Sequence, residues 1–434
     1  MKNNILFVNL PCHSTMKDFV ENDFQYNPAL GLLALTEYLE LFGFKCYVKD
    51  FNYEEIMYDV VFDLIEEKHI NIVAVTTYTE NFQMMFKFMR MIKSYNKDMI
   101  TVAGGPHATL RGIDLVKNRH IDYVISSDGE ASLTELMAFL EYGSELIELE
   151  NIESLIFKRS NEVIINSARQ QVSDLDLLPV INRERMDIKQ YREIVSVYTS
   201  KGCPANCIYC SAAAISGSIY RMRCVESVFL EGWVIYNQLP NKDSKLYFID
   251  DTFTVNRKRV QQYVELYHMY RFPMPWSCES RVDIMDEELA DLIGNSNCFS
   301  IQFGVESGDQ EVLNKIRKNI NLKHLVKMVN YIKQYPIGIF LSFMIGHFCD
   351  TRESVSRTIR LAKELSRSSS NVTYGISINT PFPGTWQYEH AEELGIEIIE
   401  SDFSKFNLTT PVIRTKYLNE NELKEFHLEA NSRN

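Results

Sequence analysis

Short, continuously apolar runs alternate with longer amphipathic stretches along the first 150 residues. The apolar runs predict strands over residues 4–10, 45–50, 72–77, 100–103 and 123–126. The amphipathic stretches predict helices over residues 28–42, 53–68 and 81–94, and a last helix that ends at Tyr142. Strands that are apolar throughout are buried on both faces. Residues 1–150 are therefore predicted to form an α/β domain whose parallel sheet has helices on both sides.

A second series of alternating strands and helices follows a mixed, polar connector over residues 151–193, which is predicted to carry short strands. Its predicted strands are residues 194–200, 245–249, 275–277, 300–304, 339–345 and 373–379. Helices are predicted between them, for example over residues 256–271 and 352–366. Six such units favour an open, partial (βα)6 barrel over residues 194–385, because a closed barrel takes eight. Residues 386–434 are predicted to be a short helical tail.

The charge and the cysteine content narrow the function classes. The chain has a formal charge of −13, which disfavours nucleic acid and anionic membrane as main partners. Residues 1–14 resemble a buried strand more than a signal peptide, and no apolar run is long enough to span a membrane. Nine cysteines in so long a chain without a secretion signal favour reduced thiols and a cytoplasmic protein. A cluster of cysteines is then a candidate metal site.

Cys203, Cys207 and Cys210 form such a cluster. They lie in a loop after an apolar strand, and such a loop can hold three thiolates around one soft metal centre. Three cysteines leave one iron of a 4Fe–4S cluster without a protein ligand. Structural zinc is the alternative, but it normally takes four ligands, and no second cysteine pair lies nearby. Simple electron transfer is disfavoured because ferredoxin clusters use four cysteines.

The spacing C-x₃-C-x₂-C, with Tyr209 before the last cysteine, closely resembles the signature of the radical S-adenosylmethionine (SAM) superfamily. Further segments of the second domain are similar to segments of that family in the same order. These segments are residues 248–253, 276–281, 304–308 and 380–385. Residues 346–351 depart from the family, which often has a G-x-P-G-E-T-like turn there, and Asp350 stands where the glutamate would be.

The resemblance implies roles for individual residues of the second domain. Cys203, Cys207 and Cys210 would bind the 4Fe–4S cluster, whose open iron can chelate the amino and carboxylate groups of SAM. The residues implied to bind SAM are Tyr209, Asp250, Asp251, Arg281, Glu306 and Ser307. Physically, aspartates can neutralise an ammonium group, and an arginine can pair with a carboxylate. A helix cap for Asp251 and an interior ion pair for Arg281 are the structural alternatives.

Together with the barrel, the N-terminal half resembles the branch of this superfamily that carries a Rossmann-like cobalamin-binding domain. The residues implied to bind cobalamin are Thr76, Thr77, Thr79, Gly104, Gly105, His107 and Glu130. A glycine pair permits close approach of a large ligand. The D-x-H-x-x-G motif that supplies a lower histidine ligand is absent, since no histidine has an aspartate two residues before it. Cobalamin without such a ligand is implied, and loss of cobalamin binding is the alternative.

The resemblance implies a radical SAM enzyme that reductively cleaves SAM at its cluster to a 5′-deoxyadenosyl radical. With cobalamin, the implied reaction is methylation of an unactivated carbon of a small-molecule or peptide substrate. Radical rearrangement, oxidation or cyclisation is the alternative within the superfamily. A non-catalytic cobalamin- or metal-binding module is the alternative outside it. A one-electron donor such as flavodoxin or ferredoxin is required by the chemistry, whereas no residue is identified as catalytic.

Overall fold

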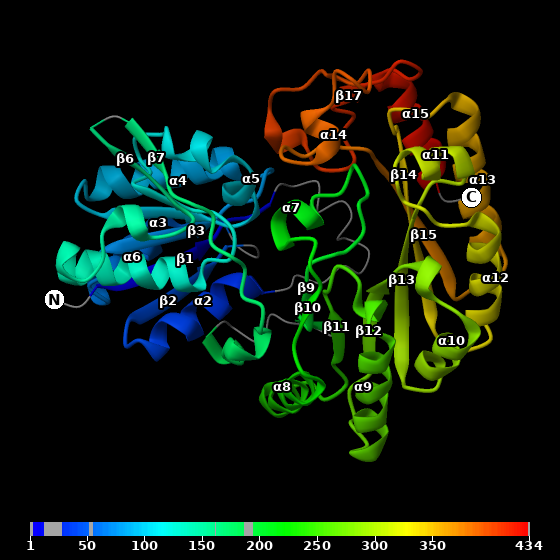
Figure 1. Cartoon of the computed structure of the whole chain (residues 1–434), viewed down its shortest axis with the longest axis horizontal. Coiled ribbons are helices and arrows are strands. Elements are labelled where there is room, and N and C mark those ends of the chain that lie inside the picture. The colour runs from blue at the N-terminus through cyan, green and yellow to red at the C-terminus, as the bar shows by residue number, and fades with distance from the viewer. Residues whose placement is uncertain (1–2, 13–27, 52–54, 161, 186–193, 433–434) are drawn as a thin grey trace. The chain divides into compact units, whose positions relative to one another are not determined.

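The chain consists of two compact units, residues 1–191 and 192–434, each built around its own main sheet (Figure 1). The computed structural model describes residues 3–12, 28–51, 55–160, 162–185 and 194–432. Within this described part of the chain, every helix is too short or too polar to cross a lipid bilayer.

The sheet of the first unit has the strand order β2-β1-β3-β4-β5-β6-β7. Its strands are β1 (Asn4–Asn9), β2 (Lys45–Asp50), β3 (Ile72–Thr76), β4 (Ile100–Gly104), β5 (Tyr123–Ile125), β6 (Leu155–Arg159) and β7 (Glu162–Ile165). The first five pair with one another in parallel. The predicted α/β domain with a parallel sheet is thereby confirmed, and its order 2-1-3-4-5 is a common doubly wound arrangement.

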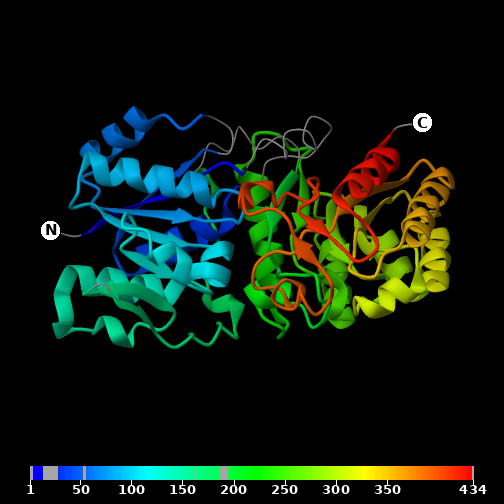
Figure 2. The same cartoon turned by 90° about the horizontal axis from the view of Figure 1, so that it is seen from above.

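Helices cover both faces of this sheet (Figure 2). They are α2 (Leu30–Leu41), α3 (Tyr58–Glu67), α4 (Phe82–Tyr95), α5 (Pro106–Val116) and α6 (Glu130–Tyr142). Helices α3, α4 and α5 share one apolar core with the sheet, and α2 and α6 share the other. The continuously apolar strands are thus explained, since alternate side chains enter opposite cores. The predicted start of the second helix, at residue 53, lies outside the described residues.

The segment predicted as a connector begins as part of the first sheet. Strand β6 pairs antiparallel with β5, and β7 pairs antiparallel with β6. Strands β6 and β7 therefore extend the first sheet, and this part of the predicted connector lies in the first unit. An edge hairpin buries only one face, so the outward-facing positions of β6 and β7 are polar. For this reason the sequence pattern did not indicate that these strands belong to the first sheet.

The second unit contains an open sheet with the order β15-β14-β13-β12-β11-β8. Its strands are β8 (Ile194–Val197), β11 (Lys245–Phe248), β12 (Trp276–Ser280), β13 (Cys298–Glu306), β14 (Gly338–Ile345) and β15 (Val372–Ile378). All six are parallel to their neighbours. The predicted partial (βα)6 barrel is confirmed. A short antiparallel pair, β9 (Ser200–Lys201) and β10 (Arg221–Met222), precedes and follows the cysteine loop.

Helices follow the strands of this second sheet. They are α7 (Ala212–Ser216), α8 (Val225–Gln238), α9 (Arg257–Met269), α10 (Glu287–Gly294), α11 (Gln310–Lys315), α12 (Leu322–Ile332) and α13 (Arg352–Arg367).

The C-terminal tail is less purely helical than predicted. It contains α14 (Trp386–Glu389), the antiparallel pair β16 (Glu397–Ile398) and β17 (Ile413–Arg414), and α15 (Glu420–Asn431). Helix α15 packs on β15, where the Tyr374 hydroxyl donates to the Ala430 carbonyl at 3.0 Å and the Asn431 amide donates to the Ile376 carbonyl at 3.1 Å. The tail thus covers the last strand of the open sheet.

Candidate active site

A cavity of about 640 Å³ lies at the carboxyl ends of the strands of the second sheet. It is lined by the cysteine loop, by residues at or just beyond the ends of β11, β12 and β13, by Ser342 of β14 and by the segment after β15. Ligands of parallel α/β sheets bind at this end, because the loops there vary freely without disturbing the strands. The cavity is therefore the candidate active site of this unit.

All three cysteines of the predicted cluster line this cavity. Gly202 opens their loop with φ +89°, and a Cβ there would lie 2.2 Å from the Ile219 carbonyl oxygen, so glycine is required. The loop is fixed by main-chain hydrogen bonds from Cys203 N to the Gly217 carbonyl (3.1 Å) and from Ile208 N to the Ile316 carbonyl (3.2 Å). Burial, followed by the charges of Cys207, Glu306 and Cys203, raises the pKa of Cys210 to about 12. Coordination to a metal would lower the pKa of the Cys210 thiol again, since a coordinating thiol is deprotonated.

The donor set fits a multinuclear cluster better than a single ion. Within the described residues, no three His, Cys, Asp or Glu side chains converge closely enough to hold one metal ion. Zinc would require such convergence, because its ligands bond to one atom. An iron–sulfur cubane is several bonds across, so its cysteines bond to different irons and stand apart on a shared wall. Three thiols line one cavity, and a 4Fe–4S cluster bound by them would keep one iron for a further ligand.

Arg281 follows β12 and is held by four interactions. Its Nε and Nη2 donate to the two carboxylate oxygens of Asp283, each at 3.0 Å. Nη2 also donates to the Lys318 carbonyl at 2.8 Å. Nη1 lies 3.7 Å from the Sγ of Cys207. The predicted SAM ligand thus lines the cavity, but most of its hydrogen-bonding capacity is directed at the protein.

Glu306 lines the cavity and forms a buried ion pair with Lys318, at 3.0 Å. The pairing of β13 with β14 shifts register beside Glu306, which has φ +70°. A Cβ on Gly304 would lie 2.7 Å from the Glu306 carboxylate and 2.8 Å from Lys318 Nζ. Gly304 therefore makes room for the ion pair, and a bulge in the strand turns the carboxylate into the wall of the cavity.

The two adjacent carboxylates after β11 have different environments. Asp250 is buried, and it accepts hydrogen bonds from the main-chain N–H of Thr199 (2.6 Å) and Ser200 (3.0 Å) and from both hydroxyls. It does not line the cavity, in contrast to the expectation that it binds SAM. Asp251 does line the cavity, and burial raises its pKa while the backbone of Gly202 opposes the shift.

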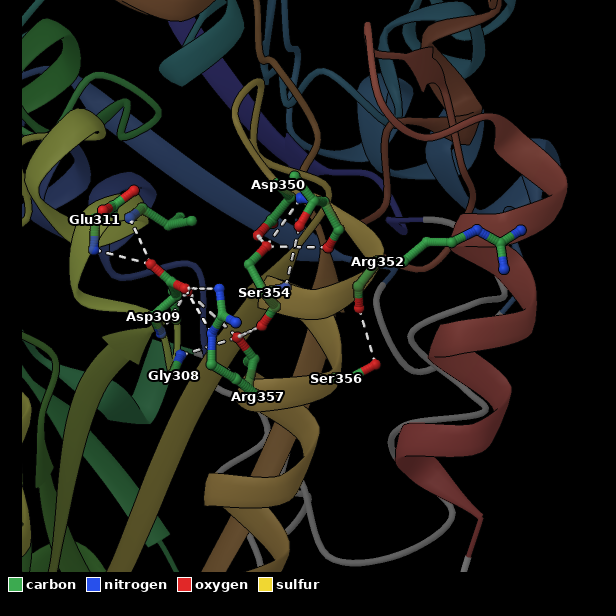
Figure 3. Close-up of polar contacts among 12 residues, drawn as sticks. Gly308, Asp309, Glu311, Asp350, Arg352, Ser354, Ser356 and Arg357 are labelled. Carbon is green, nitrogen blue, oxygen red and sulfur yellow. Dashed lines mark hydrogen bonds and ion pairs between the residues drawn. The ribbon is translucent and has the colours of Figure 1, made fainter.

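Ser307 is likewise directed into the protein, toward helix α13, which Figure 3 shows beside the loop after β13. The Ser307 hydroxyl lies 3.3 Å from that of Thr358 and accepts from the Asp309 N–H at 3.1 Å. Figure 3 also shows Arg357 of α13 bound to the carboxylate of Asp309. These contacts fasten the loop after β13 and so support Glu306, whereas Ser307 itself does not line the cavity.

The loop that departs from the family turn, residues 346–351, is organised by Asp350. Its buried carboxylate accepts from the main-chain N–H of Gly346 and His347, both at 3.0 Å, and from the Ser354 hydroxyl at 2.6 Å. Asp350 thus replaces the missing Pro-Gly turn with side-chain hydrogen bonds.

His347 was not predicted from the sequence, and the structure buries it behind the cavity. The side chain is fully buried, and neither ring nitrogen has a hydrogen-bond partner among the described residues. Its ring packs on that of Tyr209, with 5.5 Å between the centroids, and Tyr209 lines the cavity.

Other cavity residues that were missed are Thr252, Glu279, Gln302, Arg317, Lys318 and Trp386. For Gln302, alternation along β13 was an available signal, because Gln302, Gly304 and Glu306 share one face.

In the first unit, the structure gathers most of the predicted cobalamin residues at the carboxyl ends of β3 and β4. Thr77 N donates to the Gly104 carbonyl at 2.8 Å, and His107 N donates to the Thr77 carbonyl at 2.9 Å. Gly105 has φ +92°, and a Cβ there would lie 2.5 Å from the Thr76 hydroxyl and 2.9 Å from Thr77 N. Glycine is therefore required at position 105, where these two loops touch.

His107 is buried beside Thr79, with 3.0 Å between Nδ1 and the Thr79 hydroxyl. Burial, assisted by Arg111, lowers the pKa of His107 to about 4. The hydroxyl of Thr77 is buried without a hydrogen-bond partner in the described structure, so a ligand oxygen or nitrogen could satisfy it. Glu130 begins α6 beyond the end of β5, at the same edge of the sheet. These side chains can hold a polar ligand, and the unpaired hydroxyl is the observation that favours one.

Two family models match the chain, one in each unit. Residues 16–137 match the B12 binding domain, and residues 197–362 match the radical SAM superfamily. The second match contains the cysteine loop and the ends of β11, β12 and β13 that line the cavity. The second unit therefore contains a radical SAM domain, and the first unit contains a B12 binding domain.

Several known proteins are similar to this chain over most of its length. It is 28% identical to an uncharacterized methyltransferase of Pyrococcus horikoshii, over 96% of this chain and 89% of the relative. It is 23% identical to the anaerobic magnesium-protoporphyrin IX monomethyl ester cyclase of Rubrivivax gelatinosus, over 96% and 75%. Its fold is similar to the radical SAM methyltransferase TsrM of Kitasatospora setae, with a TM-score of 0.74 and 18% identity over 93% of this chain and 78% of that one. That structure contains cobalamin and a [4Fe–4S] cluster.

Proposed function

We propose that this protein is a cobalamin-dependent radical SAM methyltransferase that acts on a carbon atom of a small molecule. The observation that carries the proposal is the cavity at the end of the second sheet, where three thiols share a wall with charged side chains from successive strands. A B12-binding unit in the same chain favours methyl transfer over the other reactions of the superfamily.

Cys203, Cys207 and Cys210 would hold the 4Fe–4S cluster. When bound, this cluster supplies the electron that cleaves SAM to methionine and a 5′-deoxyadenosyl radical. The chain itself binds and orients the reactants. Asp251 and Glu279 line the cavity as acceptors for an ammonium group, while the Glu306 carboxylate, fixed by Lys318, can accept from ribose hydroxyls. Tyr209 supplies an apolar wall that excludes water from the reacting atoms.

Cobalamin would lie at the edge formed by Thr76, Thr77, Thr79, Gly104 and Gly105. The glycine pair lets a large ring approach the backbone, and the unpartnered Thr77 hydroxyl supplies a hydrogen bond to a polar ligand. His107 is committed to Thr79 and is kept neutral by burial. We therefore assign no histidine of the described residues as a ligand of cobalt.

The substrate and the electron donor are the partners of this reaction. At the cavity, the Arg317 guanidinium stacks over Trp386, 4.8 Å from the ring centroid. In the described structure no carboxylate pairs with Arg317, whereas Arg281 and Lys318 are both paired. This favours a small, anionic substrate with an apolar face. The electron donor would be a flavodoxin or a ferredoxin.

The test uses the full chain, reconstituted without oxygen with iron, sulfide and hydroxocobalamin. Dithionite and SAM carrying a deuterated methyl group are then added. We expect 5′-deoxyadenosine, and deuterium recovered in the cobalamin fraction, both measured by mass spectrometry. Loaded protein that forms no 5′-deoxyadenosine would exclude a radical SAM enzyme. Formation of 5′-deoxyadenosine without any label in cobalamin would exclude methyl transfer.

Cyclisation or oxidation is a second candidate, because the relative from Rubrivivax gelatinosus is named as a cyclase. The same assay separates the two functions. A cyclase would leave the deuterated methyl group on methionine, whereas a methyltransferase would move it to cobalamin and then to the substrate.

A further inference from the structure

Arg281 is oriented by the protein so that one end of its guanidinium meets a cysteine of the proposed cluster. Asp283 binds Nε and Nη2 in a two-pronged pair at 3.0 Å, and the Lys318 carbonyl accepts from Nη2 at 2.8 Å. This arrangement places Nη1 at 3.7 Å from the Cys207 sulfur. A guanidinium has five N–H groups, so one N–H of Nη1 is left for any further partner.

A carboxylate ligand would bind an arginine through two parallel N–H groups. On Arg281 the edge formed by Nε and Nη2 is already taken by Asp283, and Nη1 is directed at sulfur. The contacts therefore disfavour the role that the sequence implied, pairing with the carboxylate of SAM. They favour a role that acts through Cys207.

The charge of Arg281 would act strongly on a cluster bound to Cys207. Its side chain is only 14% exposed, so salt and water screen it weakly. Reduction of a cluster adds one electron and one negative charge, which a nearby cation and an N–H donor to sulfur both stabilise. Asp283 opposes this effect because its negative charge partly cancels that of Arg281.

We infer that Arg281 raises the reduction potential of the cluster through its charged hydrogen bond to the Cys207 sulfur, and that Asp283 moderates this effect. Arg281 is then a positioning residue, which sets how easily the cluster accepts an electron from its donor. The inference depends on the proposed function, since it requires a cluster at these cysteines.

The experiment is a reductive titration of the reconstituted full chain with dithionite, without SAM, followed by electron paramagnetic resonance. At a fixed potential, R281Q should lower the ratio of reduced to oxidised cluster about tenfold, equivalent to 59 mV for one electron. R281K should lower it less, because lysine keeps the charge but not the planar fork. D283N should raise the ratio, because it removes the opposing charge. An unchanged ratio in R281Q overturns the inference.

Binding of SAM to the same variants, measured by equilibrium dialysis, separates the inference from its rival. Weaker SAM binding in R281Q with an unchanged reduction ratio would make Arg281 a SAM ligand and overturn the inference. If R281Q binds no iron, R281K and D283N test the inference instead. The inference requires that R281K lowers the ratio of reduced to oxidised cluster and that D283N raises it. Failure of the wild-type chain to assemble any cluster would instead contradict the proposed function itself.

Discussion

The two candidate ligand regions present their polar groups in different ways. At the edge of the first sheet, hydroxyls, main-chain groups and His107 bond to one another, and glycine allows the loops to touch. In the cavity of the second unit, thiols and carboxylates face open space, and buried partners such as Lys318 hold them there. A ligand that is bonded covalently to the chain requires particular side chains. A ligand that is held by main-chain groups and hydroxyls mainly requires enough space. The cavity should therefore be sensitive to loss of side chains, and the edge to their addition.

Replacement of any one cluster cysteine is the strongest test of this contrast. C203A, C207A and C210A should each reduce 5′-deoxyadenosine formation by at least about a hundredfold, because a cluster needs all three thiolates. The matched control is C224S, in which serine preserves the cap of α8 that Cys224 provides. The contrast would be contradicted if C203A, C207A or C210A still formed 5′-deoxyadenosine. It would also be contradicted if C224S lost that activity.

Addition of a methyl group at Gly105 tests the sensitivity of the sheet edge. G105A should destabilise the first unit by about 1–3 kcal/mol, because φ is positive and the new Cβ would collide with Thr76 and Thr77. Urea unfolding followed by circular dichroism measures the change.

Gly31 is the control for this substitution, because it lies in helix α2 and a Cβ added there would have no described atom within 4 Å. G31A should leave stability unchanged or raise it by up to about 1 kcal/mol. Equal effects of the two substitutions would show that the contact at Gly105 is unimportant.

The pH dependence of stability tests the burial of His107. Its pKa is lowered to about 4 by burial, whereas an unfolded histidine titrates near 6.5. Between these values the unfolded chain binds the proton and the folded chain does not, so stability falls as the pH falls. The protonation of His107 in the unfolded chain should lower the free energy of unfolding by about 2 kcal/mol between pH 7 and pH 5.

Glu80 changes the pH dependence of stability in the opposite direction, because burial raises the pKa of its carboxyl group to about 7. The folded chain then binds a proton that the unfolded glutamic acid does not, and falling pH favours folding. The difference between wild type and H107Q isolates His107, since both contain Glu80. A difference that does not change with pH would contradict a buried, neutral His107.

Replacement of His347 is expected to have the smallest effect, and it should be stabilising. H347F removes two unsatisfied buried nitrogens and should raise the stability of the cofactor-free protein by about 1–2 kcal/mol. H324F is the control, because His324 lies 2.9 Å from the Met285 carbonyl and should lose stability. A lower melting temperature for H347F would show that the histidine ring is required for packing.

Both parallel sheets and the three cavity thiols could be predicted from the sequence, since apolar strands and motif spacing are local properties. The distinction between Asp250 and Asp251 could not, because it depends on Thr199 and Ser200, about fifty residues earlier in the chain. The same holds for Ser307, whose partner is on α13. Short strands were expected in the segment of β6 and β7, but their place in the first sheet was not predicted, because the pairing of β6 with β5 is non-local. Tertiary contacts decide which polar side chains face the cavity.

Mössbauer spectroscopy of the chain reconstituted with ⁵⁷Fe tests the central claim most directly. Three cysteine ligands predict about four irons per chain, with one iron that lacks a protein ligand. Addition of SAM should therefore change the signal of one iron and leave the other three unaltered. A centre with a single iron would contradict the account. Four irons whose Mössbauer signals all stay unchanged on addition of SAM would contradict it as well.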